Sequence, residues 1–192
     1  MASLPLARER QGCEKMSSKS EKIKSIVFVA VFGAMLCVVS QIAIPMPSAV
    51  PITLQILMVA LAGYTLGVSR SLLSVLLYVS IGALGLPVFS SFNGGIGVLV
   101  GPTGGFIWGF FAVALICAVF AKTKLAIPLG IVSVFVCHFI GVLQYMLVSK
   151  ITLWVAILSV SLPYIVKDIA LVVVAYFISC KLNKILIKEV AK

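Results

Sequence analysis

One acidic residue stands alone in the hydrophobic part of this chain. Asp168 is the only carboxylate between Glu21 and Glu189, and Lys167 directly precedes it. A carboxylate at membrane depth costs roughly 2.5–3.5 kcal/mol on insertion scales, so it usually faces a cavity, a partner or a transport pathway. An ionised carboxylate only accepts hydrogen bonds, which suits a ligand with N–H donors. We therefore expect Asp168 to bind a ligand, with an ion pair to Lys167 or a helix cap as the structural alternative.

Amide side chains could supply further polar contacts. Asn93 lies in a Phe-Asn-Gly-Gly segment, and its amide can both donate to and accept from a urea or a carboxylate. Asn-Gly also favours turns without any ligand, and we weigh the two interpretations evenly. Gln41 and Gln55 flank a segment that contains three prolines. They could line a pocket there or cap helices.

Three aromatic residues are expected close together at the outward-facing end of the protein: Phe89, Phe92 and Tyr164. Their rings could form the wall of an apolar ring-binding site. An aromatic belt at the membrane interface explains them almost as well.

The chain contains a single histidine, His138. It could relay protons, but a hydrogen bond to a neighbouring residue is the interpretation we favour. We expect no Ser-His-Asp arrangement, because His138 and Asp168 should lie at different depths. The five cysteines show no metal-ligand spacing. We therefore predict neither an enzyme nor a protein with a metal or cofactor.

The glycines between Gly101 and Gly105 could cradle an anion at the start of a helix. No Lys-Ser or Lys-Thr pair follows them, so they are not a nucleotide P-loop. The chain has no Walker motif with which to hydrolyse ATP.

Composition predicts the elements that must position these residues. The chain is 62% hydrophobic and only 10% charged, which indicates an all-α integral membrane protein in a lipid bilayer. A net charge of +10 would suggest nucleic acid binding in a soluble protein. Here the basic residues lie at the ends of hydrophobic segments, as the positive-inside rule predicts, so nucleic acid is not expected.

The hydrophobic segments predict six membrane-spanning helices, at 23–44, 54–68, 71–84, 106–121, 126–148 and 164–182. We expect a tight turn at Ser69-Arg70 and a short re-entrant or interfacial helix at 151–162. Pro163 should open the last span. Residues 1–22 would form a polar cytoplasmic tail, and residues 23–188 a single six-helix domain.

Basic residues set the predicted orientation. They gather in both tails and in two of the connections between spans, at Lys15, Lys19, Lys22, Lys24, Arg70, Lys122, Lys124, Lys181, Lys184, Lys188 and Lys192. Both termini should therefore be cytoplasmic. The proline-rich and glycine-rich loops would lie outside and form a ligand pocket with the start of the last span. Met16 opens a basic stretch and is a candidate for the natural start of the chain.

Four motifs together resemble the BioY family, the biotin-specific substrate-binding subunits of energy-coupling factor transporters. They are Val50-Pro51-Ile52-Thr53-Leu54-Gln55, Gly82-Ala83-Leu84-Gly85-Leu86-Pro87-Val88-Phe89, Asn93-Gly94-Gly95 and Gly101-Pro102-Thr103-Gly104-Gly105. The resemblance covers about residues 24–188. It implies a multi-pass subunit of a bacterial plasma membrane that captures biotin from outside. That subunit would dock on a transmembrane coupling subunit that carries two cytosolic ATPase subunits.

The resemblance also assigns roles to residues. It implies that Asn93 and Asp168 contact biotin, that Thr53 and Gln55 belong to the pocket, and that the loop before them forms a lid. It further implies that Ala30 and Ala34 bind the coupling subunit, where a small-xxx-small surface permits close helix contact.

One family contact has moved or been lost in this chain. The family pattern around the acid is Pro-Gly-Asp-x-x-Lys, whereas this chain has Val166-Lys167-Asp168-Ile169-Ala170-Leu171. Our hypothesis is that Lys167 replaces the missing lysine, because its flexible stem can deliver the charge from a shifted position. The alternative function is a proton-coupled secondary carrier for biotin or another small vitamin, in which Asp168 or His138 would titrate. The lack of an obvious inverted repeat counts against it.

Overall fold

A computed structural model describes residues 4–47 and 50–190, and the side chains of 20–47 and 50–185. The described chain is mostly helical, as predicted. Its helices are α1 (Leu4–Val39), α2 (Gln55–Leu66), α3 (Val68–Ala83), α4 (Ile96–Val100), α5 (Gly104–Phe120), α6 (Ala126–Ser149), α7 (Leu153–Val160) and α8 (Leu162–Val190), with a 3₁₀ turn η1 (Ser90–Phe92). A short antiparallel pair joins β1 (Ala43–Ile44) to β2 (Ile52–Thr53). The outer tail lysines Lys15, Lys19, Lys188 and Lys192 lie outside the described side chains.

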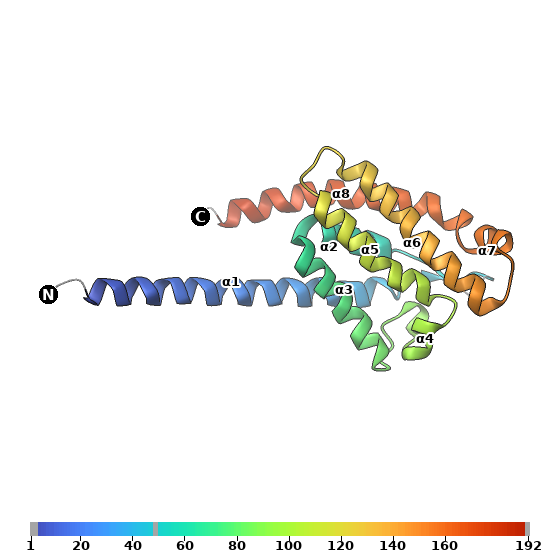
Figure 1. The fold of residues 1–192 in the computed structure, drawn as a ribbon, viewed down its shortest axis with the longest axis horizontal. Coiled ribbons are helices and arrows are strands. Elements are labelled where there is room, and N and C mark those ends of the chain that lie inside the picture. The colour runs from blue at the N-terminus through green and yellow to red at the C-terminus, as the bar shows by residue number, and fades with distance from the viewer. Residues whose placement is uncertain (1–3, 48–49, 191–192) are drawn as a thin grey trace.

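The helices form a bundle with two distinct ends (Figure 1). Within it, α5 packs along α6, α2 contacts both α5 and α8, and α1 packs on α3. The N-terminal half of α1 and the C-terminal end of α8 project from the same end of the bundle (Figure 1). The short helices α4 and α7 lie toward the opposite end. The chain thus begins and ends its described course on one side.

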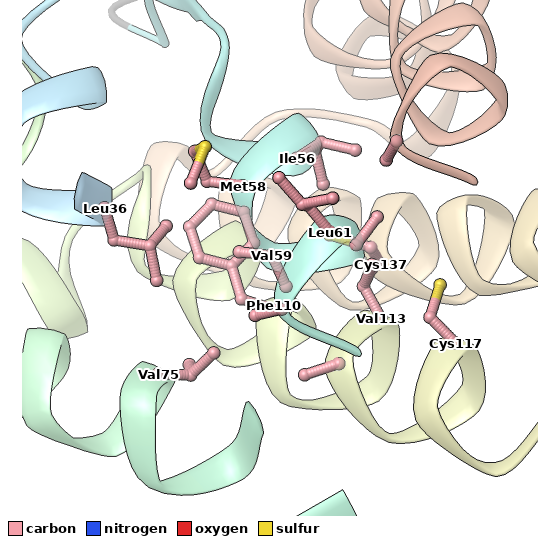
Figure 2. Packing of buried hydrophobic residues seen from close by; sticks show 14 of the residues in the cluster. Leu36, Ile56, Met58, Val59, Leu61, Val75, Phe110, Val113, Cys117 and Cys137 are labelled. Atoms are coloured by element: carbon pink, nitrogen blue, oxygen red, sulfur yellow. The ribbon is translucent and has the colours of Figure 1, made fainter. Parts of the chain in front are cut away.

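Small and branched side chains fill the centre of the bundle. Leu36, Val59, Val75 and Val113 have no exposed surface, and Phe110 is almost as buried (Figure 2). They come from α1, α2, α3 and α5, so they join four helices in one core. Large apolar side chains are also exposed on the outside, which fits a surface that lipid tails cover.

Helix length supports only part of the six-span prediction. In the described residues, Ser20–Val39 and Ala126–Ser149 are each long and apolar enough to cross a membrane. The pair α7 and α8, bent by 49°, would make a third span. The other apolar helices, α2, α3 and α5, have 12, 16 and 17 residues. At 1.5 Å per residue they reach roughly 18–26 Å, which is less than the ~30 Å hydrocarbon core.

Several expected helix boundaries are wrong: α1 begins at Leu4 and not at residue 23, and α8 continues to Val190 and not only to residue 182. The first helix ends at Val39 and not at Ile44, because Ala43 and Ile44 pair with Thr53 and Ile52 as strands. This pairing closes the proline-rich segment into a hairpin. The turn between α2 and α3 is at Gly67, where φ is +79° and a side chain would be strained, so Ser69-Arg70 belongs to the first turn of α3.

The last part of the chain agrees better with expectation. Helix α7 is the short helix predicted before the last span. Pro163 lies in the first turn of α8, where its missing N–H has no helical acceptor to lose.

Candidate ligand-binding site

A cavity of about 50 Å³ lies between α2, α3, α5, α6, α8 and the segment that leads into β2. The polar and aromatic residues of its lining are Thr53, Gln55, Tyr78, Ser90, Thr103, Phe106, Phe110, Tyr164, Lys167 and Asp168. Ligand pockets usually enclose roughly 300–1,000 Å³. A ligand of vitamin size must therefore displace part of this lining when it enters.

Asp168 is the electrostatic centre of the cavity. It is 5% exposed, and its two carboxylate oxygens have different partners. Lys167 Nζ lies 2.6 Å from Oδ1, and His138 Nε2 lies 3.2 Å from Oδ2. The lysine charge compensates the carboxylate charge, so this pair can remain buried.

These contacts show one alternative and correct one expectation. The ion pair with Lys167, given above as the structural alternative for Asp168, is present: neighbouring residues on a helix point about 100° apart, but the four-carbon stem of Lys167 bends back to Asp168. His138 and Asp168 were expected at different depths. Asp168 lies in the second turn of α8, about 9 Å along the axis from Leu162, and this brings it level with the middle of α6.

A Ser-His-Asp arrangement is therefore present, contrary to prediction. Ser161 Oγ lies 3.1 Å from His138 Nδ1, on the other side of the imidazole from Asp168. Ser161 occupies the bend between α7 and α8, and neither it nor His138 lines the cavity. The serine is therefore not presented to a ligand as a nucleophile would be.

Helix α8 is also tied to the segment around β2. Lys167 Nζ donates to the Thr53 carbonyl at 2.7 Å, and the Tyr164 hydroxyl donates to the Val50 carbonyl at 2.5 Å. Thr53 Oγ1 donates to Gln55 Oε1 at 2.9 Å. Two side chains of α8 thus hydrogen-bond to the segment that was predicted to form a lid.

The polar contacts continue across the cavity to α3. Gln55 Nε2 lies 2.6 Å from the Tyr78 hydroxyl and donates to it. Five of the residues expected at the site therefore line a single cavity, namely Thr53, Gln55, Tyr164, Lys167 and Asp168.

The three remaining predicted contacts lie elsewhere. Asn93 is exposed, and its Nδ2 donates to the Ser90 carbonyl at 2.9 Å, which is the turn chemistry considered above. It lines a neighbouring hollow of about 150 Å³ that shares Pro51, Ser90 and Thr103 with the cavity. Phe92 is 71% exposed, and Phe89 is buried edge-on against Tyr78, 5.4 Å between ring centroids. Their direct contact with a ligand stays a prediction.

Sequence reasoning missed the aromatic wall that the cavity does have. Phe106 and Phe110 line it from α5, together with Tyr78 from α3. Their i, i+4 spacing places the two phenylalanines on one helix face, and this was the available signal.

The glycines that precede these phenylalanines serve helix packing. A Cβ on Gly105 would lie 2.7 Å from the Ile140 carbonyl oxygen, so glycine lets α5 approach α6 closely. Gln144 Nε2 on α6 donates to the carbonyls of Leu99 and Gly101, at 2.8 and 2.9 Å. The segment thus presents carbonyls to an amide donor in this structure.

The expected partner surface is accessible. Ala30 and Ala34 are both exposed on α1, whereas Gly33 between them is buried against Leu77 of α3. The two faces of α1 are therefore separated: one packs inside the chain, and the other is open. No cluster of three or more His, Cys, Asp or Glu side chains that could hold a metal occurs in the described part of the chain.

Comparison with known proteins agrees with this architecture. The family model described as the BioY family matches residues 14–188. This chain belongs to the BioY family. A "Probable biotin transporter BioY" from Pyrococcus horikoshii is 37% identical over 162 residues, which cover 84% of this chain and 98% of that protein. A "Biotin transporter BioY" from Rhodobacter capsulatus is 32% identical over 169 residues, covering 79% and 88%.

A shorter stretch of this BioY family member matches more strongly. A "Biotin transporter BioY" from Thermotoga maritima is 42% identical over 102 residues, and the match spans 53% of this chain and 60% of that relative. The relatives thus come from both bacteria and archaea.

One solved structure shares the fold. It is a crystal structure of the S-component for biotin from an ECF-type ABC transporter, with a TM-score of 0.79. The match covers 86% of this chain and 93% of that one at 24% identity, so it supports the helix arrangement rather than individual contacts.

Proposed function

We propose that this chain binds biotin as the substrate-binding S component of an energy-coupling factor transporter. It is a transporter subunit and not an enzyme. The observation that carries the proposal is the cavity in a BioY family fold that brings Asp168, Lys167 and Tyr164 together beside two phenylalanines. Relatives that align over most of their length are named biotin transporters.

The chemistry of biotin fits this lining. Its ureido group offers two N–H donors and a carbonyl acceptor. Each carboxylate oxygen has about two acceptor positions, so Asp168 can accept a ureido N–H while it keeps its contact with His138. Lys167 would then donate to an acceptor of the ligand. The rings of Phe106 and Tyr164 supply apolar surface for the fused ring system of biotin.

Asn93 would contact the polar end of the ligand that lies away from the ureido group, if the segment around β2 moves. The hollow beside Asn93 already shares three lining residues with the cavity. Opening the segment 50–53 would therefore join the two spaces. Phe92, which is exposed on the same turn, would cover the ligand from outside.

The membrane topology that we propose has six crossings, with both termini in the cytoplasm of a bacterial plasma membrane. The shared end of α1 and α8 supports an even number of crossings (Figure 1). The basic residues Arg70, Lys122 and Lys124 fall in the connections that this topology places inside. The short helices α2, α3 and α5 would complete their crossings with the turns that flank them.

The proposed partners are a transmembrane coupling subunit and two cytosolic ATPase subunits. The exposed Ala30 and Ala34 offer the coupling subunit a flat helix surface. The chain would supply the capture of biotin, and the ATPases would supply the energy.

Equilibrium binding of labelled biotin to the purified chain in detergent tests the proposal. We expect saturable binding, and we expect Asp168→Asn to weaken it by about 10- to 100-fold, because the ureido N–H loses a charged acceptor. Desthiobiotin, which keeps the urea, should compete better than lipoic acid, which lacks it. A folded wild-type chain that binds no biotin would contradict the proposal.

A proton-coupled carrier remains the second candidate, because two side chains that can each bind a proton, His138 and Asp168, lie in buried contact. Biotin uptake by cells separates the two mechanisms. Uptake that stops with a protonophore but survives ATP depletion would favour the carrier. Uptake that follows the ATP supply, and requires the partner subunits, would favour the S component.

A further inference from the structure

We propose that His138 is a positioning residue for ligand recognition: its Nε2 holds the Asp168 carboxylate in the orientation that the ligand meets. This inference rests on the proposed function. It adds a residue that lies outside the cavity and acts on the ligand only through Asp168. Neither the family motifs nor the cavity lining includes His138.

The geometry around the carboxylate carries the inference. The Oδ2 atom faces His138 behind the cavity, and the Oδ1 atom faces Lys167, which lines the cavity. His138 is 3% exposed, and its ring packs edge-on against Phe106, 5.6 Å between centroids. Both ring nitrogens are engaged, so the imidazole has little freedom to turn.

Hydrogen-bond chemistry fixes the position of the imidazole proton. A carboxylate only accepts, so Nε2 must carry the proton that points to Asp168. The Ser161 hydroxyl then donates to Nδ1 of a neutral ring. An imidazolium would add a second positive charge beside Lys167 in a buried site that holds one carboxylate. The carboxylate thus sets the tautomer, and the Ser161 hydroxyl, which can donate or accept, is compatible with it.

The two partners of Asp168 differ in mobility. The Lys167 side chain is 25% exposed, and it is shared with the Thr53 carbonyl, so it can move when the segment around β2 opens. The His138 side chain is 4% exposed and is fixed at both ends of its ring. When a ligand displaces Lys167, His138 is the contact that keeps the carboxylate oriented.

The competing interpretation is purely structural. Through Ser161, His138 also joins α6 to the bend between α7 and α8. If this were its whole role, the bond at Nδ1 would matter and the bond at Nε2 would not. The two nitrogens can be tested separately.

Two substitutions separate the roles of the ring nitrogens. The amide nitrogen of Gln can reach the place of Nε2, whereas the shorter Asn can reach only that of Nδ1. We expect His138→Gln to bind biotin within about threefold of the wild type, and His138→Asn to bind roughly 10- to 100-fold more weakly. Thermal melts of both variants report the structural effect of the changes. Asn binding like the wild type while Gln binds weakly, or equal losses in both, would overturn the proposal.

A double-mutant cycle tests whether His138 acts through Asp168. In an Asp168→Asn background, His138→Asn should weaken biotin binding by less than about threefold further. Independent, multiplicative losses would contradict the proposal. Weak binding in this background is measured by competition at high biotin concentration.

NMR gives a readout that does not require biotin. The chain contains one histidine, so ¹⁵N-histidine labelling yields the signals of His138 alone. We expect the Nε2–H tautomer in the wild type and a changed Nε2 signal in Asp168→Asn. If the wild type binds no biotin, the proposed function fails, whatever the NMR shows. If biotin binds but the Nε2 signal does not change in Asp168→Asn, only the proposed role of His138 fails.

Discussion

At the scale of single residues, Lys167 gives this site its positive charge. The family lysine position is Leu171, which is partly buried and packs against the core. Lys167 Nζ instead lies between the Asp168 carboxylate and the Thr53 carbonyl. We expect Lys167→Met, which keeps the apolar stem, to weaken biotin binding by about tenfold, because it leaves a buried carboxylate without its cation. Equilibrium binding measures the loss.

Moving the cation back provides a matched rescue. Position 171 is one helical turn from 167 on the same face of α8. The double variant Lys167→Met with Leu171→Lys should therefore recover part of the affinity. If Lys167→Met binds biotin as tightly as the wild type while Asp168→Asn does not, Lys167 does not replace the family lysine.

The residue scale also shows which parts of the site can be predicted from sequence. Asp168 and Lys167 were identifiable because charges are rare in an apolar chain and need a buried partner. His138 and Ser161 were not connected to them, because contacts between helices depend on where each helix starts and how it tilts. The start of α8 at Leu162, two residues before the expected span, placed Asp168 about 3 Å further along the helix than expected. For Asn93 the motif was visible but its role was not, because the same Asn-Gly motif serves a turn and a ligand contact.

At the scale of elements, helix α8 holds the segment before α2 through two side chains. Tyr164 and Lys167 are three residues apart, on one face of α8, and they bond to the carbonyls of Val50 and Thr53. We call these two hydrogen bonds the clasp. A cavity of about 50 Å³ is too small for biotin, so the clasp must open when biotin enters or leaves.

Removal of one of the two hydrogen bonds of the clasp should speed biotin release. Tyr164→Phe loses a hydrogen bond worth about 1 kcal/mol and keeps the ring, so we expect the dissociation rate to rise about fivefold. A chase with unlabelled biotin measures the rate. Tyr176→Phe is the matched control, because Tyr176 lies on the same helix but packs against Tyr64, outside the cavity lining. Equal rates in both variants would refute the clasp.

Helix centres were easier to predict than helix ends. Each expected span overlaps a helix, since long apolar runs specify helices in this class of protein. The ends depended on local effects that composition does not show. Pairing of Ala43 and Ile44 with β2 ended the first helix early, and the positive φ of Gly67 moved the turn before α3.

At the scale of the whole molecule, one face of α1 packs inside the bundle and another is exposed, while no described residue of α1 lines the cavity. Its inner face packs on α3 through Gly33, next to Leu77 and Ser74. Its outer face presents Ala30 and Ala34. The family resemblance predicted both alanines as a docking surface, and the described bundle leaves that surface open.

This separation predicts a variant that binds biotin but does not support uptake. Ala30→Trp with Ala34→Trp adds bulk to the outer face and leaves the cavity residues in place. We expect unchanged biotin affinity of the isolated chain, loss of co-purification with the coupling subunit, and uptake reduced at least about fivefold, because overpacking a close helix contact costs roughly 1–3 kcal/mol. Met35→Trp is the control, since Met35 is exposed and points about 100° away from Ala34. If the double variant takes up biotin normally with its partners, the coupling subunit binds another surface.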